Sequence, residues 1–198
     1  MTRTQIINSL IKKNNYKSYL EIGVNTPAQP GYNWTNVQVE LKHGVDPNVD
    51  TTFKMTSDDF FEKHIKQKYD IIFVDGLHIF EQAYRDIINS LDNLNENGTI
   101  VVHDCNPISE ITQRRIRESN EWHGDVWKSI LKLRLENKDV EISTVDTDEG
   151  CAIIKKGSQQ CLKLNENTSE LYEYSTLEKN RINILNLISV NEFVKKYL

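Results

Sequence analysis

The stretch from Tyr69 to Asn106 constrains the fold of this chain more than any other feature. It contains an apolar run at 71–74, an amphipathic segment at 79–94 and a second apolar run at 99–102. Apolar residues spaced three and four apart are typical of a helix, and short apolar runs bounded by turn residues are typical of buried strands. Two strands joined by a helix lie parallel in one sheet. The stretch therefore predicts a parallel α/β unit.

Polar residues stand directly after both of these strands. Asp75 follows the first strand, with His78 three residues further on, and His103 and Asp104 follow the second. In open α/β sheets, ligands bind in the crevice outside the carboxyl ends of the strands. We therefore expect these four side chains to share one crevice and to perform chemistry there.

The same alternation of strands and helices extends over the whole chain. Strands are expected at 18–24, 43–46, 71–75 and 99–104, with a turn at 96–98, and a hairpin over 140–156 turns at 148–150. Helices are expected at 4–13, near Trp34, from an N-cap at Ser57, and at 79–94, 125–137 and 176–197. Alternating strands and helices imply right-handed parallel crossovers. The sequence predicts an α/β fold, a three-layer α/β/α sandwich with a mostly parallel sheet and an antiparallel C-terminal hairpin.

Composition narrows the functional classes. The net charge is −5, and Lys and Arg are spread along the chain, so no basic field attracts nucleic acid or an anionic membrane. The three cysteines have no CxxC spacing, which suggests a reducing compartment. The N-terminal segment lacks the apolar core of a signal peptide, and no stretch approaches the roughly 20 apolar residues of a membrane helix. We expect a soluble cytoplasmic protein with no nucleic-acid or membrane partner.

A set of motifs in a fixed order connects the chain with a known family. The motifs are LEIGV, GVDP, MTSDDFF, FVDGLH and VVHDC. Together they resemble the class I S-adenosylmethionine-dependent methyltransferases, and among these a bacterial group associated with glycan and secondary-metabolite modification. The resemblance implies a Rossmann-like fold, S-adenosyl-L-methionine as cofactor and a small molecule as substrate. It also implies a single methyltransferase domain over 1–198, with an N-terminal helix within 1–16, a substrate-cap insertion at 107–124 and a C-terminal tail and helix at 156–198.

The resemblance places the methionine end of the cofactor after the first strand, at Glu21, Gly23, Val24 and Asn25. A carboxylate at Glu21 suits the ammonium group of the cofactor, and a glycine lets the backbone approach a ligand closely. A simpler interpretation of Gly23 is a glycine that is required only for a tight turn.

The ribose and the adenine are expected further along the same edge of the sheet. Asp46 matches the acidic residue that accepts hydrogen bonds from the ribose hydroxyls, although an aspartate before proline is also a frequent turn pair. Thr56, Ser57 and Asp58 match the segment that contacts adenine, and Asp75 completes the predicted cofactor site. Ser57 is equally well explained as a helix N-cap, which does not exclude the other role.

The resemblance implicates His78, Asp75 and Asp104 in catalysis. In catechol-type O-methyltransferases a general base lies at the same offset from a strand-end aspartate, and His78 occupies that position here. An imidazole has an unperturbed pKa of about 6.5, so it can take the proton of an attacking hydroxyl. The predicted reaction is O-methylation of a sugar, a glycan precursor or another small-molecule hydroxyl. The plainer alternative is a structural histidine, which is the commoner role of a lone histidine on a helix.

A metal site is the next hypothesis. Asp75, Asp104 and Asn106 would offer Mg²⁺ three oxygen ligands, as in metal-dependent relatives. Cys105 stands where the catechol-type enzymes have a carboxamide, and a thiol is a poor ligand for Mg²⁺. We therefore do not favour a metal at this site. Without one, Asp104 is expected to orient His78 or His103, or to bind substrate hydroxyls.

The insertion at 107–124 is rich in basic and aromatic residues. Its notable members are Arg114, Arg115, Arg117, Trp122 and His123. In folds of this kind the segment often caps the substrate, and these residues would suit a phosphorylated or acidic sugar. A solvated surface helix explains the same pattern equally well.

Alternative functions stay open. The loop after the first strand, TPAQPG, is stiffer and longer than a glycine-rich loop, which is compatible with a catalytically silent protein that binds the cofactor or serves as a scaffold. An NAD-dependent enzyme on the same sheet is a third hypothesis, but no GxGxxG follows the first strand. The helices at the two ends of the chain are compatible with a homodimer.

Overall fold

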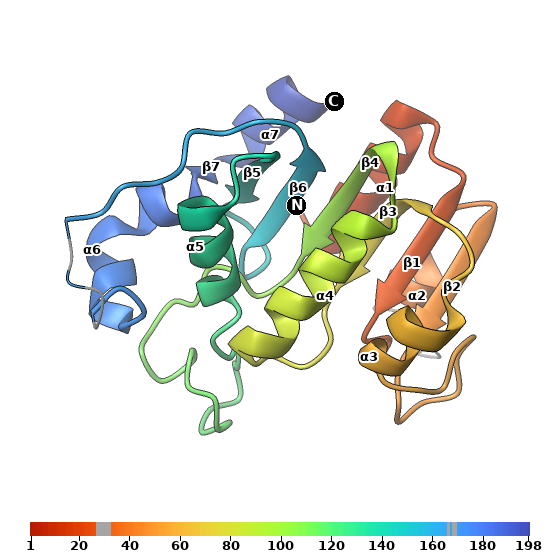
Figure 1. Ribbon diagram of the computed structural model, residues 1–198, viewed down its shortest axis with the longest axis horizontal. Coiled ribbons are helices and arrows are strands. Elements are labelled where there is room, and N and C mark those ends of the chain that lie inside the picture. The colour runs from red at the N-terminus through yellow and green to blue at the C-terminus, as the bar shows by residue number, and fades with distance from the viewer. Residues whose placement is uncertain (27–32, 166, 168–169) are drawn as a thin grey trace.

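A computed structural model describes residues 1–26, 33–165, 167 and 170–198 of the chain (Figure 1). The TPAQPG segment, apart from Thr26, lies outside the described residues. No helix among the described residues combines the length and the apolar character needed to cross a bilayer.

A seven-stranded sheet forms the centre of the described chain, in the order β2-β1-β3-β4-β6-β5-β7. The strands are β1 (Ser18–Ile22), β2 (Leu41–Val45), β3 (Tyr69–Val74), β4 (Leu94–Val102), β5 (Val140–Val145), β6 (Cys151–Lys156) and β7 (Leu187–Ile188). The first four strands are parallel, and β6 runs antiparallel to both β4 and β5. The predicted fold, a mostly parallel sheet with an antiparallel C-terminal hairpin, is therefore confirmed.

Helices cover both faces of this sheet (Figure 1). They are α1 (Arg3–Asn14), α2 (Asn33–Asn36), α3 (Ser57–Asp59) with the π-helical turn η1 (Phe60–His64), α4 (Phe80–Asp92), α5 (Trp127–Glu136), α6 (Tyr174–Leu185) and α7 (Val190–Tyr197). Buried residues of α4, α5 and α6 share one hydrophobic core, and those of α1 and α7 share another. Successive residues of β3 alternate between the two: Ile72 belongs to the first core and Ile71 to the second. Successive side chains of a strand point to opposite faces of the sheet, and both faces are buried here. The sequence of β3 is therefore a continuous apolar run.

The direction of the chain reverses across β1. From β1 the chain crosses to β2 on one side, and it then returns to β3 on the other side. The loops that follow these strands are tied together: the Gly23 amide donates to the Val45 carbonyl at 2.9 Å, and the Asp75 amide donates to the Ile22 carbonyl at 2.9 Å. A crevice at such a switch point is the usual ligand site of an open α/β sheet.

Local details differ from the sequence-based expectations in several places. Thr56, and not Ser57, caps α3, because the Thr56 hydroxyl accepts from the amide of Asp59. The predicted turn at 96–98 lies within β4, next to a register shift against β3. The single helix expected at 176–197 is two helices, because Asn186 adopts a left-handed conformation, φ +44°, and the chain then adds β7 to the sheet edge.

Candidate active site

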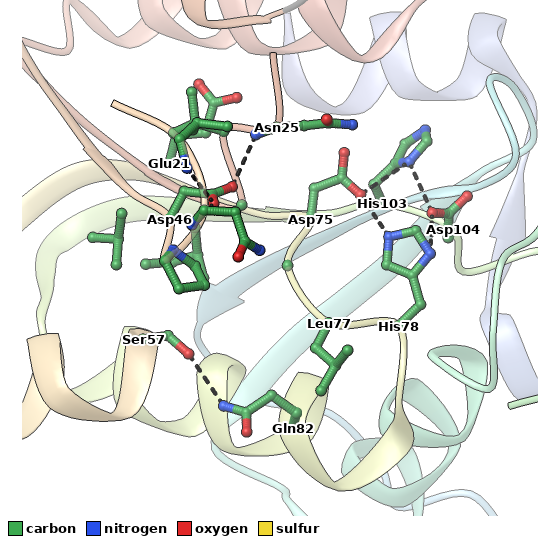
Figure 2. A pocket seen from close by; sticks show the side chains of 18 of the residues that line it. Glu21, Asn25, Asp46, Ser57, Asp75, Leu77, His78, Gln82, His103 and Asp104 are labelled. Atoms are coloured by element: carbon green, nitrogen blue, oxygen red, sulfur yellow. Dashed lines mark hydrogen bonds and ion pairs between the residues drawn. The ribbon is translucent and has the colours of Figure 1, made fainter. Parts of the chain in front are cut away.

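A cavity of about 820 Å³ opens at the carboxyl ends of β1, β2, β3 and β4 (Figure 2). Every residue predicted from the sequence for cofactor binding or catalysis lines it. They are Glu21, Gly23, Val24, Asn25, Asp46, Thr56, Ser57, Asp58, Asp75, His78 and Asp104. The topology of the sheet thus brings together side chains from four separate loops.

Gly23 occupies the closest contact between the loops after β1 and β3. Its φ is +86°, and a Cβ at this position would lie 2.1 Å from the carbonyl oxygen of Asp75. Both the backbone conformation and the missing side chain are therefore required. The tight-turn interpretation is compatible with this geometry, and so is close approach to a ligand, because Gly23 also lines the cavity.

Glu21 places a carboxyl group in the wall of the cavity, where only 2% of its surface is exposed. Tyr19 donates its hydroxyl hydrogen bond to Glu21 Oε2 at 2.8 Å. Burial raises the pKa of Glu21 to about 8, although the hydrogen bond from Tyr19 and the charge of Lys42 oppose the shift. The carboxyl group consequently favours its neutral form at neutral pH until a cation approaches it.

Asp46 organises the turn after β2. Its Oδ2 accepts from the Asn25 amide at 3.0 Å, and its Oδ1 accepts from the amides of Asn48 and Val49 at 2.8 and 3.3 Å. A carboxylate offers about four acceptor sites, so these three bonds leave room for one more donor. Asp46 is therefore both a turn residue, as the plainer interpretation holds, and an acceptor at the cavity wall.

A hydrogen-bonding group that the sequence did not reveal lies beside the segment 56–58 in the cavity wall. The side-chain amide of Gln82, on α4, donates to Ser57 Oγ at 3.1 Å and to Asp58 Oδ1 at 3.0 Å (Figure 2). It also donates to buried Asp86 at 3.1 Å. Burial raises the pKa of Asp86 to about 6, against the hydrogen bonds from Ser57 and Gln82. Gln82 thereby fixes the segment that was matched to adenine binding.

His78 lies between two carboxylates. Its Nε2 is 3.3 Å from Asp75 Oδ1, and its Nδ1 is 3.2 Å from Asp104 Oδ2 (Figure 2). Burial alone would lower the pKa of His78, but Asp75 and Asp104 outweigh it and raise the pKa. The ring stacks on Trp122 with 5.0 Å between centroids and an interplanar angle of 19°. The imidazole is therefore held in one orientation and stabilised in its charged form.

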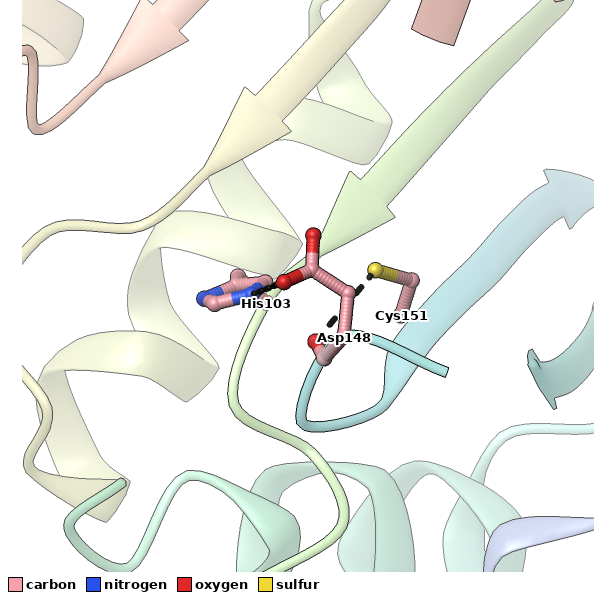
Figure 3. A group of neighbouring side chains, drawn as sticks. All are labelled: His103, Asp148 and Cys151. Carbon is pink, nitrogen blue, oxygen red and sulfur yellow. Dashed lines mark hydrogen bonds and ion pairs between the residues drawn. The ribbon is translucent and has the colours of Figure 1, made fainter. Parts of the chain in front are cut away.

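His103 extends this network along the cavity wall toward α1 and the β5–β6 turn. Its Nδ1 is 3.5 Å from Asp75 and 3.3 Å from Asp104 (Figure 2). Its Nε2 is 3.9 Å from Asp148 (Figure 3) and 3.2 Å from Arg3. Burial would lower the pKa of His103, but the surrounding carboxylates hold it well above 6.5. Burial would raise the pKa of Asp148, but His103 and Arg3 lower it to about 2. Arg3 thus joins α1 to the β5–β6 turn.

The three ligands of the hypothetical Mg²⁺ site do not come together. Asn106 donates from its side-chain amide to Asp146 at 3.0 Å and accepts from Arg181 at 2.6 Å, so both of its polar atoms are engaged away from Asp75. Cys105 is fully buried, and its thiol donates to backbone carbonyls. Asp75 and Asp104 therefore lack the third oxygen donor that was expected from this segment.

The segment 107–124 forms turns and no regular helix, which corrects the surface-helix alternative. Arg114 pairs with Glu110 and Glu118, and Arg115 pairs with Glu81 and Asp125. Arg117 differs from both, because it lines the cavity and its guanidinium donates to two backbone carbonyls. Trp122 also lines the cavity, whereas His123 is buried behind it. The basic residues of this segment therefore face different surroundings.

Several cavity residues carry no local signal in the sequence. Arg3, Gln82 and Glu149 line the cavity, although the sequence did not implicate any of them in ligand binding. Leu77 lies within the FVDGLH motif but was given no role from it; it lines the cavity with 54% of its surface exposed.

Comparisons with known proteins fit this geometry. A family model described as a methyltransferase domain matches residues 3–105, more than half of the chain. A comparison with curated protein sequences finds no match.

Solved structures provide further matches. A putative caffeoyl-CoA O-methyltransferase from Staphylococcus aureus matches with a TM-score of 0.57 and 19% identity, over 78% of this chain and 82% of that one. An O-methyltransferase from Bacillus cereus, in complex with S-adenosylhomocysteine, matches with a TM-score of 0.57 and 12% identity, over 79% and 82%. The O-methyltransferase TomG from Streptomyces achromogenes, in complex with S-adenosylmethionine, matches with a TM-score of 0.57 and 12% identity, over 79% and 80%. At these identities the likeness establishes the fold.

Proposed function

We propose that this chain, which belongs to the methyltransferase domain family, transfers a methyl group from S-adenosylmethionine to a hydroxyl group of a small molecule. One observation carries the proposal: a single cavity at the switch point of the sheet has acceptors for a nucleoside at one end and a carboxylate-bound imidazole at the other. The family match confirms the resemblance to class I methyltransferases. The cofactor, the acceptor and the roles of single residues are what we propose here.

The walls of the cavity suit the separate parts of the cofactor. Buried Glu21 would receive the ammonium group, and the remaining acceptor site of Asp46 would receive one ribose hydroxyl. Ser57, Asp58 and Gln82 offer hydrogen-bonding groups at the adenine end. Two proteins of the same fold, from Bacillus cereus and Streptomyces achromogenes, were crystallised with S-adenosylhomocysteine and S-adenosylmethionine, which supports the same ligand class here.

His78 is the proposed general base. When bound, S-adenosylmethionine supplies a methyl group on a positively charged sulfur. An acceptor hydroxyl that reaches Nε2 of His78 would replace the 3.3 Å contact to Asp75, while Asp104 keeps Nδ1 in place. The uncharged form of His78, which is populated above its raised pKa, would accept the hydroxyl proton at Nε2. The hydroxyl oxygen would then form its bond to the methyl carbon, and the electrons of the broken carbon–sulfur bond would stay on the sulfur of S-adenosylhomocysteine. Asp75 and Asp104 stabilise the imidazolium that results.

The acceptor is proposed to be a sugar or glycan precursor with an acidic group. Arg117 supports this class, because within the described chain its guanidinium is bonded to backbone carbonyls and to no carboxylate. Trp122, stacked on His78, offers an apolar and aromatic surface beside the base. The segment 107–124 would then serve as the substrate cap that the sequence predicted.

Cofactor binding can be tested before the acceptor is known. S-Adenosylhomocysteine at 100 times its Kd should stabilise the fold by about 2.7 kcal/mol. For a chain of this size that is a rise in Tm of roughly 5–11 °C. NAD⁺ at the same concentration should give no shift. Absence of a shift with saturating S-adenosylhomocysteine would contradict the proposal.

Methyl transfer needs a second assay. Transfer of labelled methyl from S-adenosylmethionine should be measured with sugar phosphates, nucleotide sugars, uronic acids and neutral sugars. The proposal expects turnover with an acidic member of this panel. Cofactor binding without transfer to any sugar or phenol would favour the catalytically silent alternative.

A further inference from the structure

The guanidinium of Arg3 is a charged group in the cavity wall for which the proposed mechanism has no use. Arg3 is the first residue of α1, and it lines the same cavity as Glu21 and His78. Its side chain is 26% exposed, so it is neither freely solvated nor sealed in the core. A cation in such surroundings attracts an anionic group more strongly than the same cation does in bulk water.

The contacts of Arg3 determine which part of its guanidinium stays free. Its backbone amide donates to Asp148 Oδ2 at 2.5 Å, and its Nη1 donates to Asp148 Oδ1 at 3.1 Å. Nη1 also lies 3.2 Å from His103 Nε2. Because Nη1 carries two N–H groups, these two side-chain contacts use both of them.

The opposite edge of the guanidinium has no partner in the described chain. Nε and Nη2 of Arg3 donate to no described residue, and both atoms stay accessible. Together they present two parallel N–H groups, the fork that binds a carboxylate through two hydrogen bonds. The free edge of Arg3 is therefore complementary to a carboxylate.

Glu21 lies close enough to Arg3 for its ionisation to depend on that charge. Burial raises the pKa of Glu21 to about 8, and the charge of Arg3 is one of the influences that oppose the rise. Burial also raises the pKa of Tyr19, the hydrogen-bond partner of Glu21, and Arg3 opposes this rise as well. The next residue of α1, Thr4, donates to Asn33, which lines the same cavity. An acidic group and a free guanidinium edge thus act on one another within one cavity.

We propose that Arg3 is a specificity-determining residue that binds the carboxylate of the cofactor's amino-acid moiety, next to the ammonium site at Glu21. The inference rests on the proposed function, which places S-adenosylmethionine in this cavity. An α-amino acid carries its ammonium and its carboxylate on one carbon atom, so it needs an acceptor and a fork of donors near each other. Arg3 thereby distinguishes the cofactor and its product from nucleosides that lack the carboxylate.

A purely structural Arg3, which only joins α1 to the β5–β6 turn, is the competing explanation. The contacts to Asp148 are sufficient for that role, but they leave Nε and Nη2 unused. Removal of the carboxylate from the ligand separates the two explanations, because it leaves the protein intact.

The test is a calorimetric comparison of S-adenosylhomocysteine with its decarboxylated analogue, which keeps the ammonium group, the ribose and the adenine. The wild type should bind the analogue more weakly by about tenfold or more, since it loses charge-assisted hydrogen bonds. Arg3→Gln should bind S-adenosylhomocysteine more weakly by a similar factor. It should bind the analogue with wild-type affinity, which also establishes that its cavity is folded.

Two further variants sharpen the comparison. Arg3→Lys keeps the charge but loses the fork, so its affinity for S-adenosylhomocysteine should lie between those of the wild type and Arg3→Gln. Arg114→Gln is the matched control, because Arg114 is already paired with Glu110 and Glu118. This control should bind both ligands as the wild type does.

Three results would overturn the assignment of Arg3. The first is a wild type that binds both ligands equally well. The second is an Arg3→Gln variant that loses both ligands to the same extent, as the structural explanation predicts. The third is an Arg3→Gln variant with unchanged affinity for S-adenosylhomocysteine and a raised KM for an acidic acceptor, which would assign the guanidinium to the acceptor. A wild type that binds neither ligand would contradict the proposed function as well.

Discussion

At the scale of single residues, the chemistry of this site depends on charged side chains that are largely buried. Asp75 accepts contacts from two imidazoles, those of His78 and His103. Burial alone would raise the pKa of Asp75, but these two rings outweigh it and hold the pKa well below its usual range. A carboxylate that stays ionised next to His78 is what a histidine base needs, because the imidazolium formed during proton transfer is then stabilised.

His78→Gln removes the proposed base and keeps a polar side chain of similar length. Because general base catalysis contributes about 10²–10⁴-fold, kcat should fall by that amount. The Kd of S-adenosylhomocysteine, measured by calorimetry, should change little, since the predicted cofactor contacts are elsewhere. His64→Gln, at an exposed histidine, serves as the control. Unchanged turnover in the His78 variant would remove this residue from the mechanism.

Glu21 gives the protein a pH dependence whose sign can be worked out. Its pKa rises from 4.5 to about 8 on folding, so the folded state becomes less stable as pH increases from about 4.5 to about 8, where the proton is finally lost. Glu21→Gln, which stays neutral, should therefore have a higher Tm than the wild type above pH 8 and a similar Tm near pH 5. Equal Tm values of the wild type and Glu21→Gln at pH 9 would show that ionisation of Glu21 does not destabilise the folded state.

Binding of the cofactor should reverse the preference of Glu21 for its neutral form. An ammonium group near Glu21 favours its carboxylate, so wild-type affinity for S-adenosylhomocysteine should increase between pH 6 and pH 8. The affinity of Glu21→Gln should be weaker at pH 8 and nearly independent of pH over this range. Calorimetry at three pH values provides the measurement.

Arg3, which sequence reasoning missed, makes contacts to residues that are far away in the sequence. Arg3 reaches Asp148 across 145 positions and His103 across 100. No local pattern encodes such contacts, because they depend on how α1 packs on the finished sheet. His78 and Asp104 were predictable because each stands at the end of a strand, where the direction of the chain alone places it at the cavity.

At the scale of elements, the turns after the strands decide what the cavity can hold. The loop from β1 touches the loop from β3 at Gly23, and Gly124, with φ +60°, lies against His78. A Cβ on Gly124 would stand 1.8 Å from the carbonyl oxygen of His78. The segment that carries Trp122 is thereby fixed against the loop that carries the proposed base.

Gly23→Ala tests the contact between the two loops. The added Cβ would meet the Asp75 backbone, and alanine resists a φ of +86°. The variant should lose about 1–3 kcal/mol of stability in a urea melt. It should also lose binding of S-adenosylhomocysteine. Gly157→Ala is the control, since its nearest contact would be an ordinary 3.4 Å to Glu141. A Gly23 variant with wild-type stability and affinity would contradict the assigned role.

Arg117→Ala tests the segment 107–124 as a substrate cap. Loss of this guanidinium, which contacts no carboxylate among the described residues, should raise KM for an acidic acceptor by about tenfold or more, which corresponds to one charge-assisted hydrogen bond. The KM for S-adenosylmethionine should stay the same. Arg114→Ala is the matched control, because Arg114 is already paired with two glutamates. Equal effects of the two substitutions on the acceptor would rule out a specific role for Arg117.

Helices and strands were predictable from the sequence where the apolar residues follow a single spacing, either that of a helix or that of a strand. The helix at 79–94 and the hairpin at 140–156 appear as α4, β5 and β6. The C-terminal helix was predicted as one piece because its apolar residues continue past Asn186, and only the left-handed conformation of that residue separates α6 from α7. The cap of α3 was assigned one residue late, because two adjacent hydroxyl side chains compete for the position and the sequence does not choose between them.

At the scale of the whole molecule, the order of the strands creates the site. Because the chain leaves β1 in one direction and returns on its other side as β3, the loops after these strands diverge and a crevice forms at their carboxyl ends. The residues 21–25, 46, 56–58 and 75–78 converge there although they are spread over a third of the chain. The homodimer remains a prediction, and light scattering of the purified protein would test it.

The crystal structure of the complex with S-adenosylhomocysteine tests the central claim most directly. We expect the homocysteine ammonium beside Glu21, the ribose beside Asp46 and the sulfur in the part of the cavity that His78 faces. A ligand bound elsewhere on the molecule, or a sulfur separated from His78 by the body of the sheet, would contradict the account.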